Sequence, residues 1–125
     1  MNTQTTKLSP ADLQAGLAMH TGSQRWFKHW SQRILYTEGV RFLATHAQAF
    51  WLIDLIATWC AASALRGEGF ILWKLIVNED RSAVAIAEDG NGRDLTRQDI
   101  PFTDFPLDEI RLYLTDGTLL LASEY

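Results

Sequence analysis

The sequence predicts an α+β fold, in which N-terminal helices pack on a C-terminal antiparallel sheet. Apolar residues recur at helical spacing up to about residue 65, and after residue 69 they form short β-rich runs or alternate. The 125 residues suit one domain, and 47% of them are hydrophobic. We therefore expect a frayed arm over 1–9 and one domain over 10–125, with a helical half at about 10–65 and a sheet half at about 69–123.

The first helix is expected to begin at Pro10. Ser9 is a good N-cap residue, proline is favoured in a first helical turn, and Asp12 suits the positive end of the helix dipole. The segment Thr21-Gly22-Ser23 should end this helix, because glycine tolerates the left-handed conformation found after helix C-termini.

A second helix is expected over Gln24–Leu35, because its aromatic and aliphatic residues at 26, 27, 30 and 34 have helical spacing. This helix would turn its aromatic side to the core and its basic side to solvent. The chain has five tryptophans, and core packing in helices or strands accounts for all of them: Trp26, Trp30, Trp51, Trp59 and Trp73.

Two further helices complete the helical half. Thr37 can cap the first of them. Its apolar stripe has i, i+3, i+4, i+7 spacing and consists of Val40, Leu43, Ala44 and Ala47. The segment Gln48–Leu65 is apolar on nearly all sides, so we expect a central helix that is covered on most faces.

The apolar pattern of the second half of the sequence predicts a meander of four or five short antiparallel strands. Pro101 and Pro106 exclude the intervening loop from the sheet, because proline lacks the ladder donor. Asp116-Gly117 is a two-residue hairpin signal. The expected strands lie at Phe70–Val77, Ser82–Ala87, Asp94–Ile100, about 110–115 and Thr118–Ala122.

Charge is unevenly distributed along the chain. The formal net charge is −4, which excludes a uniformly basic nucleic-acid binder. Residues 20–46 carry four basic residues and one acid, whereas residues 79–125 carry four basic residues and eleven acids. A single cysteine excludes a disulfide framework and a multi-cysteine zinc module. The polar N-terminus and the aspartate within the longest apolar stretch predict a cytoplasmic protein with no membrane span.

Two charged surfaces are candidate binding faces. The basic candidate, interleaved with aromatic residues, could contact nucleic acid or an acidic protein, or could simply be the solvated side of a helix: Arg25, Lys28, Arg33 and Arg41. The acidic candidate for a partner protein is larger: Glu79, Asp80, Glu88, Asp89, Asp94, Asp99, Asp104, Asp108, Glu109 and Asp116. In the loop that carries Asp104, Phe102 and Phe105 either seal the sheet edge or form a docking surface.

Asp54 lies within an apolar helix, so we expect it to be buried and either paired, hydrogen-bonded or neutral. Thr58 lies one turn further on and could share its face. The simplest interpretation is a structural carboxylate that bonds Tyr36, Thr37 or Arg41, and the alternative is a general acid or base.

The side chains that could act as soft metal ligands are few and scattered along the sequence: His20, His29, His46 and Cys60. None stands in a metal-binding or catalytic motif, and Cys60 is expected to be a small buried hydrophobic residue. We therefore predict no metal, no cofactor and no catalytic residue.

Several blocks carry a family resemblance: Thr21-Gly22, Tyr36-Thr37-Glu38-Gly39-Val40, Phe50-Trp51-Leu52-Ile53-Asp54, Thr103-Asp104-Phe105-Pro106-Leu107 and Ser123-Glu124-Tyr125. From about Leu13 to the end, the chain resembles a family of small uncharacterised bacterial proteins, often found in phages, plasmids and other mobile elements. The resemblance implies a mobile-element accessory protein and transfers no catalytic residue.

Three hypotheses for function follow. The first is a non-enzymatic interaction protein, such as an anti-CRISPR-like inhibitor, that presents its acidic surface to a host nucleic-acid-binding complex. The second is a nucleic-acid-binding accessory protein that uses the basic residues near 25–41. The third is a small enzyme with Asp54 in a pocket. A homodimer is conceivable if the last strand leaves an open edge.

Overall fold

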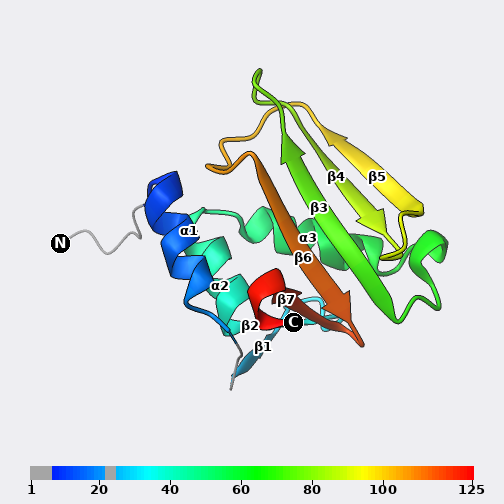
Figure 1. Cartoon of the computed structure of the whole chain (residues 1–125). Coiled ribbons are helices and arrows are strands. Elements are labelled where there is room, and N and C mark those ends of the chain that lie inside the picture. Colours follow the sequence, from blue (N-terminus) through cyan, green and yellow to red (C-terminus); the bar gives the residue numbers. More distant parts are fainter. Residues whose placement is uncertain (1–6, 22–24) are drawn as a thin grey trace.

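The computed structural model describes residues 7–21 and 25–125, which form an α+β domain with one mixed sheet (Figure 1). Its α-helices are α1 (Pro10–Ala18), α2 (Glu38–His46) and α3 (Phe50–Trp59). Two 3-10 turns follow, η1 (Ser63–Leu65) and η2 (Ala122–Glu124). The strands are β1 (Trp26–Lys28), β2 (Leu35–Thr37), β3 (Phe70–Val77), β4 (Ala83–Glu88), β5 (Asp94–Ile100), β6 (Glu109–Thr115) and β7 (Thr118–Leu121). The α+β class is confirmed, although one helical turn lies at the C-terminal end.

The expected starts of the first helix, at Pro10, and of the helix capped by Thr37 are confirmed. The Ser9 hydroxyl accepts a hydrogen bond from the Asp12 amide at 3.2 Å, and the Thr37 hydroxyl accepts one from the Val40 amide at 3.2 Å. Residue 22, predicted as a C-terminal glycine, lies outside the described residues.

The helix expected over Gln24–Leu35 is wrong. Strands β1 and β2 form an antiparallel hairpin there, in which Phe27 pairs with Tyr36 and Lys28 with Leu35. Gln32, in the connecting turn, has a φ of 64°, which a helix does not allow. Aromatic residues favour strands where they have cross-strand neighbours, and here those neighbours belong to β2, which follows the turn.

The sheet order is β1-β2-β7-β6-β3-β4-β5, so the predicted meander is wrong in topology. Strand β6 pairs with β3 instead of β5, and β2 runs parallel to β7. The cause lies in the loop after β5, where the prolines end the strand and Phe105 and Leu107 enter the core. The chain is thereby drawn across the sheet before β6 begins.

The Asp116-Gly117 hairpin between β6 and β7 is confirmed, and both residues have positive φ, as a type I′ turn requires. Strand β7 lies between β2 and β6, whereas β1 and β5 form the sheet edges. The expectation that the last strand leaves an open edge is therefore wrong, because β2 returns from the N-terminal half to pair with it.

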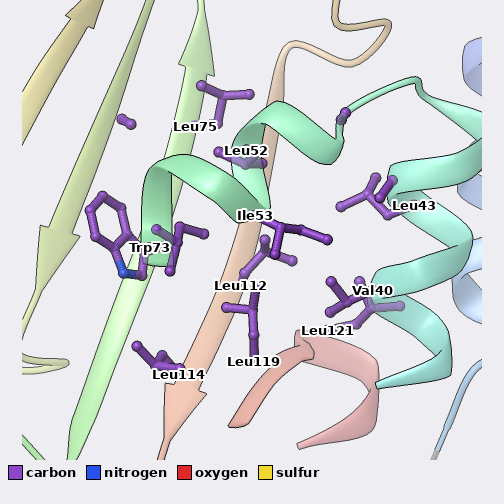
Figure 2. Close-up of a cluster of buried hydrophobic side chains, with 14 of the residues drawn as sticks. Val40, Leu43, Leu52, Ile53, Trp73, Leu75, Leu112, Leu114, Leu119 and Leu121 are labelled. Atoms are coloured by element: carbon purple, nitrogen blue, oxygen red, sulfur yellow. The ribbon is translucent and has the colours of Figure 1, made fainter. Parts of the chain in front are cut away.

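The main core lies between the sheet and helices α2 and α3 (Figure 2). Val40 and Leu43 of α2 and Leu52 and Ile53 of α3 point toward alternate residues of the central strands. These strand residues share the inner face: Trp73, Leu75, Leu112, Leu114 and Leu119. The predicted stripe of α2 is buried, as expected for an amphipathic helix.

Helix α3 is shorter and less enclosed than expected, since it ends at Trp59 instead of continuing to Leu65. Leu52, Ile53, Ile56 and Ala57 are buried, but Phe50 and Thr58 on the other side are exposed. The segment is apolar in composition, yet only one of its sides meets the sheet.

The C-terminal turn packs on the start of α2. The Thr37 hydroxyl donates to Glu124 Oε1 at 2.6 Å, and the Leu121 amide donates to the same oxygen at 3.0 Å. Gly39 makes room for this carboxylate, because a Cβ at that position would lie 2.5 Å from it. Two of the sequence blocks that carry the family resemblance therefore meet in space.

Candidate functional site

The β1–β2 hairpin exposes two of the five tryptophans, contrary to the expectation that all five are core residues. Trp26 is 55% exposed and Trp30 is 79% exposed. By contrast, Trp73 is buried, and Trp51 and Trp59 pack partly buried against the core. In β1, Trp26 and Lys28 occupy alternate positions on one face, and the exposed Leu35 pairs with Lys28. We call Trp26, Lys28, Trp30 and Leu35 the hairpin surface.

The turn of the hairpin is fixed to α3 through Asp54. His29 is buried, and its Nε2 lies 2.6 Å from Asp54 Oδ1. The indole Nε1 of Trp30 donates to the same oxygen at 3.1 Å. Asp54 therefore orients Trp30 and places its ring on the surface beside the outer side of α3.

Ser31 completes a hydrogen-bonded chain at the same turn. The Ser31 amide donates to His29 Nδ1 at 3.1 Å, and the Ser31 hydroxyl lies 2.8 Å from that nitrogen. Since an amide can only donate, Nδ1 accepts, and the geometry assigns the ring proton to Nε2, facing Asp54. The Ser31 oxygen in turn accepts the Arg33 amide at 3.2 Å. The chain Asp54–His29–Ser31 therefore holds the turn in shape.

The expectation that Asp54 and Thr58 are buried polar residues is wrong. The Asp54 side chain is 50% exposed, and Thr58 is exposed. Thr58 donates its hydroxyl hydrogen to the backbone oxygen of Asp54 at 2.8 Å, one turn back. The partners of the Asp54 carboxylate are His29 and Trp30 instead of Tyr36, Thr37 or Arg41.

We expect Asp54→Ala to release the hairpin from α3. The variant removes the acceptor of two hydrogen bonds and leaves the buried His29 nitrogen unpaired, which costs about 1–3 kcal/mol. Denaturant unfolding measures this loss, and amide hydrogen exchange should rise in residues 26–37. Asp99→Ala, an exposed aspartate on β5, is the control. Equal stability of the two variants would contradict the anchoring role.

The four basic candidates do not form one continuous face. The guanidinium carbons of Arg25 and Arg41 lie 5.5 and 4.5 Å from the centre of the Phe27 ring. Lys28 lies on the opposite side of β1 from Phe27. Arg33 lies in the turn, where its Nη1 donates to the Ala57 backbone oxygen at 3.5 Å. The basic residues thus surround the hairpin on several sides.

Cys60 is half-buried at the end of α3. Burial raises the pKa of its thiol, and the nearby Arg33 charge offsets this only in part. Thiolates are the nucleophilic form, so this environment disfavours a reactive cysteine. Within residues 7–21 and 25–125, no three or more His, Cys, Asp or Glu side chains gather as a metal site would require.

The ten acidic candidates are divided between the two ends of the sheet. One group lies where β3 ends and β6 begins: Glu79, Asp80, Asp99, Asp104, Asp108 and Glu109. The other group lies at the opposite end: Glu88, Asp89, Asp94 and Asp116. Glu88 is buried, so it is not part of any exposed face.

Half of these acids have a cation partner nearby. The ion pairs are Lys74–Glu88, Arg93–Asp89 at 3.2 Å, Arg97–Asp99 at 3.4 Å, Lys7–Asp104 at 3.0 Å and Arg111–Glu109 at 2.6 Å. The Ser82 hydroxyl and amide lower the pKa of Asp80, and a hydrogen bond from the Asn91 amide is the main cause of the lowered pKa of Asp89. These carboxylates stabilise turns and strand ends.

The loop before β6 separates its two phenylalanines. Phe105 is 0% exposed in the core, whereas Phe102 is 70% exposed. Arg81 donates to the backbone oxygens of Thr103 and Phe105 and so holds the loop on the β3–β4 turn. The expectation that both rings seal the sheet edge is wrong.

No helix in the described part of the chain combines the length and apolar character needed to cross a membrane. No curated protein and no solved structure matches the chain. The model of one protein family, of unknown function, matches residues 11–125, which supports the resemblance to an uncharacterised family. The chain belongs to this family of unknown function, DUF6876.

Proposed function

We propose that this protein is a non-enzymatic binding protein whose hairpin surface binds single-stranded nucleic acid. The observation that carries the proposal is the exposure of Trp26 and Trp30 on a hairpin that also presents Lys28 beside Trp26 and Arg33 in its turn. Indole rings stack on bases, and cations pair with the phosphates between them.

One of the two exposed rings, that of Trp30, is held by a side-chain hydrogen bond, which favours a stacking surface. Trp30 is oriented by its hydrogen bond to Asp54, and Trp26 lies on a strand paired with β2. The two residues are four positions apart, so their Cα atoms lie within about 14 Å of each other. A single strand that follows the hairpin from β1 to its turn can therefore reach both rings.

The local charge favours an anionic partner although the whole chain is acidic. The β3–β4 turn, which carries Glu79 and Asp80, lies at the opposite end of the molecule from β1 (Figure 1). Within residues 25–41 the basic residues outnumber the acids by four to one. Two carboxylates from other segments also lie at the hairpin: Asp54 accepts a hydrogen bond from Trp30, and Asp116 precedes Gly117, whose backbone oxygen accepts the Leu35 amide at 2.9 Å. Electrostatic repulsion from the acidic end is screened by salt.

Fluorescence anisotropy of a labelled single-stranded oligothymidine tests the proposal. We expect binding that weakens from about 50 to 200 mM salt with a log–log slope of about −2 to −3, as three or four phosphate contacts predict. Double-stranded DNA should bind more weakly, because its bases are not free to stack. An unchanged anisotropy at low salt would exclude this function.

A second proposal retains the acidic surface. In this case the protein is a cytoplasmic accessory of a mobile element that blocks a host nucleic-acid-binding complex, in the manner of an anti-CRISPR inhibitor. Within the described residues, four of the ten acids have neither an ion pair nor a side-chain hydrogen bond and remain available for it: Glu79, Asp94, Asp108 and Asp116. A stoichiometric partner captured from host lysate, and lost on charge reversal at Glu79 and Asp108, would favour this proposal over the first.

Catalysis is a third proposal, and the order Asp54–His29–Ser31 is the observation in its favour. The Ser31 oxygen accepts a hydrogen bond from a backbone amide, which reduces the nucleophilicity of that oxygen. Anchoring of the hairpin turn to α3 already accounts for the hydrogen bonds between Asp54, His29 and Ser31. Covalent labelling of Ser31 by a fluorophosphonate would support a hydrolase.

A further inference from the structure

A groove beside the hairpin lies between the end of α1, β1 and the outer side of α2. It has a volume of about 290 Å³, at the lower end of the range for small-ligand sites. Side chains from all three elements line it, among them His20, Arg25, Phe27, Arg41, Phe42 and His46. It faces away from the Trp26 side of β1, because Phe27 and Trp26 alternate.

Two exposed guanidinium groups line this groove and have no hydrogen-bond partner among the described residues. Arg25 and Arg41 both contact the Phe27 ring. Within the described residues, neither group has a hydrogen bond or an ion pair with a carboxylate. Glu38 also lines the groove, yet it pairs with neither. A guanidinium offers five donors in a planar fork that matches phosphate geometry.

Aromatic rings form a wall of the same groove. The Phe42 ring centre lies 5.1 Å from that of His20 and 4.4 Å from that of His46. Gly16 admits the Phe42 ring against α1, since a Cβ there would lie 2.3 Å from it. Among the described residues the buried Nδ1 of His46 has no hydrogen-bond partner, which is uncommon for a polar atom.

We infer that this groove is a phosphate-binding site, in which Arg25 and Arg41 hold the phosphate of one nucleotide unit. The inference rests on the proposed function for the identity of the ligand. The phosphate would bind next to the ring wall, so that the sugar or base attached to it packs on Phe42 or His20. Because β1 is an edge strand of the sheet, a nucleic-acid strand that passes round it would contact the groove on one side and the hairpin surface on the other.

Titration of the full chain with AMP, inorganic phosphate and adenosine, followed by NMR chemical shifts, tests the inference. We expect AMP and inorganic phosphate to shift the resonances of Arg25, Arg41 and Phe42, and adenosine to shift none of them. Arg41→Ala and Arg25→Ala should each weaken AMP binding about tenfold. Arg97→Ala, an exposed arginine on β5, should leave it unchanged.

Two results separate this inference from the proposed function. If oligothymidine binds but Arg25→Ala and Arg41→Ala change neither its affinity nor that of AMP, the phosphate site is wrong and the function stands. If AMP binds in the groove but oligothymidine does not bind the chain, the function is wrong and the phosphate site stands. If neither AMP nor inorganic phosphate shifts the resonances of the groove residues, the inferred phosphate site is also wrong.

Discussion

Phe105→Ala should lower the free energy of unfolding by about 3–5 kcal/mol. The Phe105 ring is fully buried, and its backbone is held by the hydrogen bond from its amide to Thr103 Oγ1, 3.1 Å long, and by Arg81. Truncation leaves a cavity at the point where the loop crosses the sheet to begin β6. Urea unfolding followed by circular dichroism measures the change in free energy.

Phe102→Ala is the matched control, because it removes the same ring from the same loop. Phe102 is largely exposed, so its truncation should change the free energy of unfolding by no more than about 0.5 kcal/mol. Similar losses for the two variants would mean that the loop does not enter the core as described.

Combined Trp26→Ala and Trp30→Ala substitution should weaken oligothymidine binding by at least about thirtyfold. Stacking of one base on an aromatic ring is worth about 1–3 kcal/mol, so two rings contribute about 2 kcal/mol or more. Both side chains are exposed, so the variant should remain folded. Anisotropy titration in low salt gives the affinity ratio.

Phe102→Ala serves again as the control, since it removes an exposed aromatic ring far from the hairpin in sequence. It should bind oligothymidine as the native chain does. If the double tryptophan variant binds as tightly as this control, the exposed indoles have no role in binding.

Local sequence signals predicted much of the fold. The Ser9 and Thr37 caps, the buried stripe of α2, and the strands at Phe70–Val77 and Asp94–Ile100 were predicted within a residue of their observed bounds. Each depends on residues within one turn or one strand of each other, and short-range spacing captures such interactions.

The hairpin and the sheet order were not predictable in this way. The residues of β1 have helical spacing by coincidence, and their strand conformation depends on pairing with β2, which itself pairs with β7 more than 80 residues later. The spacing consequently places the two exposed tryptophans in the core, which the structure shows to be wrong. The spacing of apolar residues within one segment does not show which distant segment will pair with it.

The site was predicted in part. Asp54 was identified as a carboxylate that needs a partner, and the structure supplies His29, 25 residues earlier. No local pattern connects the two residues, because they meet only after the hairpin docks on α3. The polarity of His29 and its neighbour Ser31 is the available signal, but scattered histidines are more often surface or capping residues, so their types alone do not predict a bond to Asp54.

The most direct measurement of nucleic-acid binding at the hairpin is the set of tryptophan indole N–H resonances during titration with oligothymidine. The chain has five tryptophans, and each gives one such signal in an ¹H–¹⁵N correlation spectrum. We predict that the signals of Trp26 and Trp30 shift, whereas those of Trp51, Trp59 and Trp73 stay in place. Saturating oligothymidine that leaves the Trp26 and Trp30 signals unmoved would contradict the proposal.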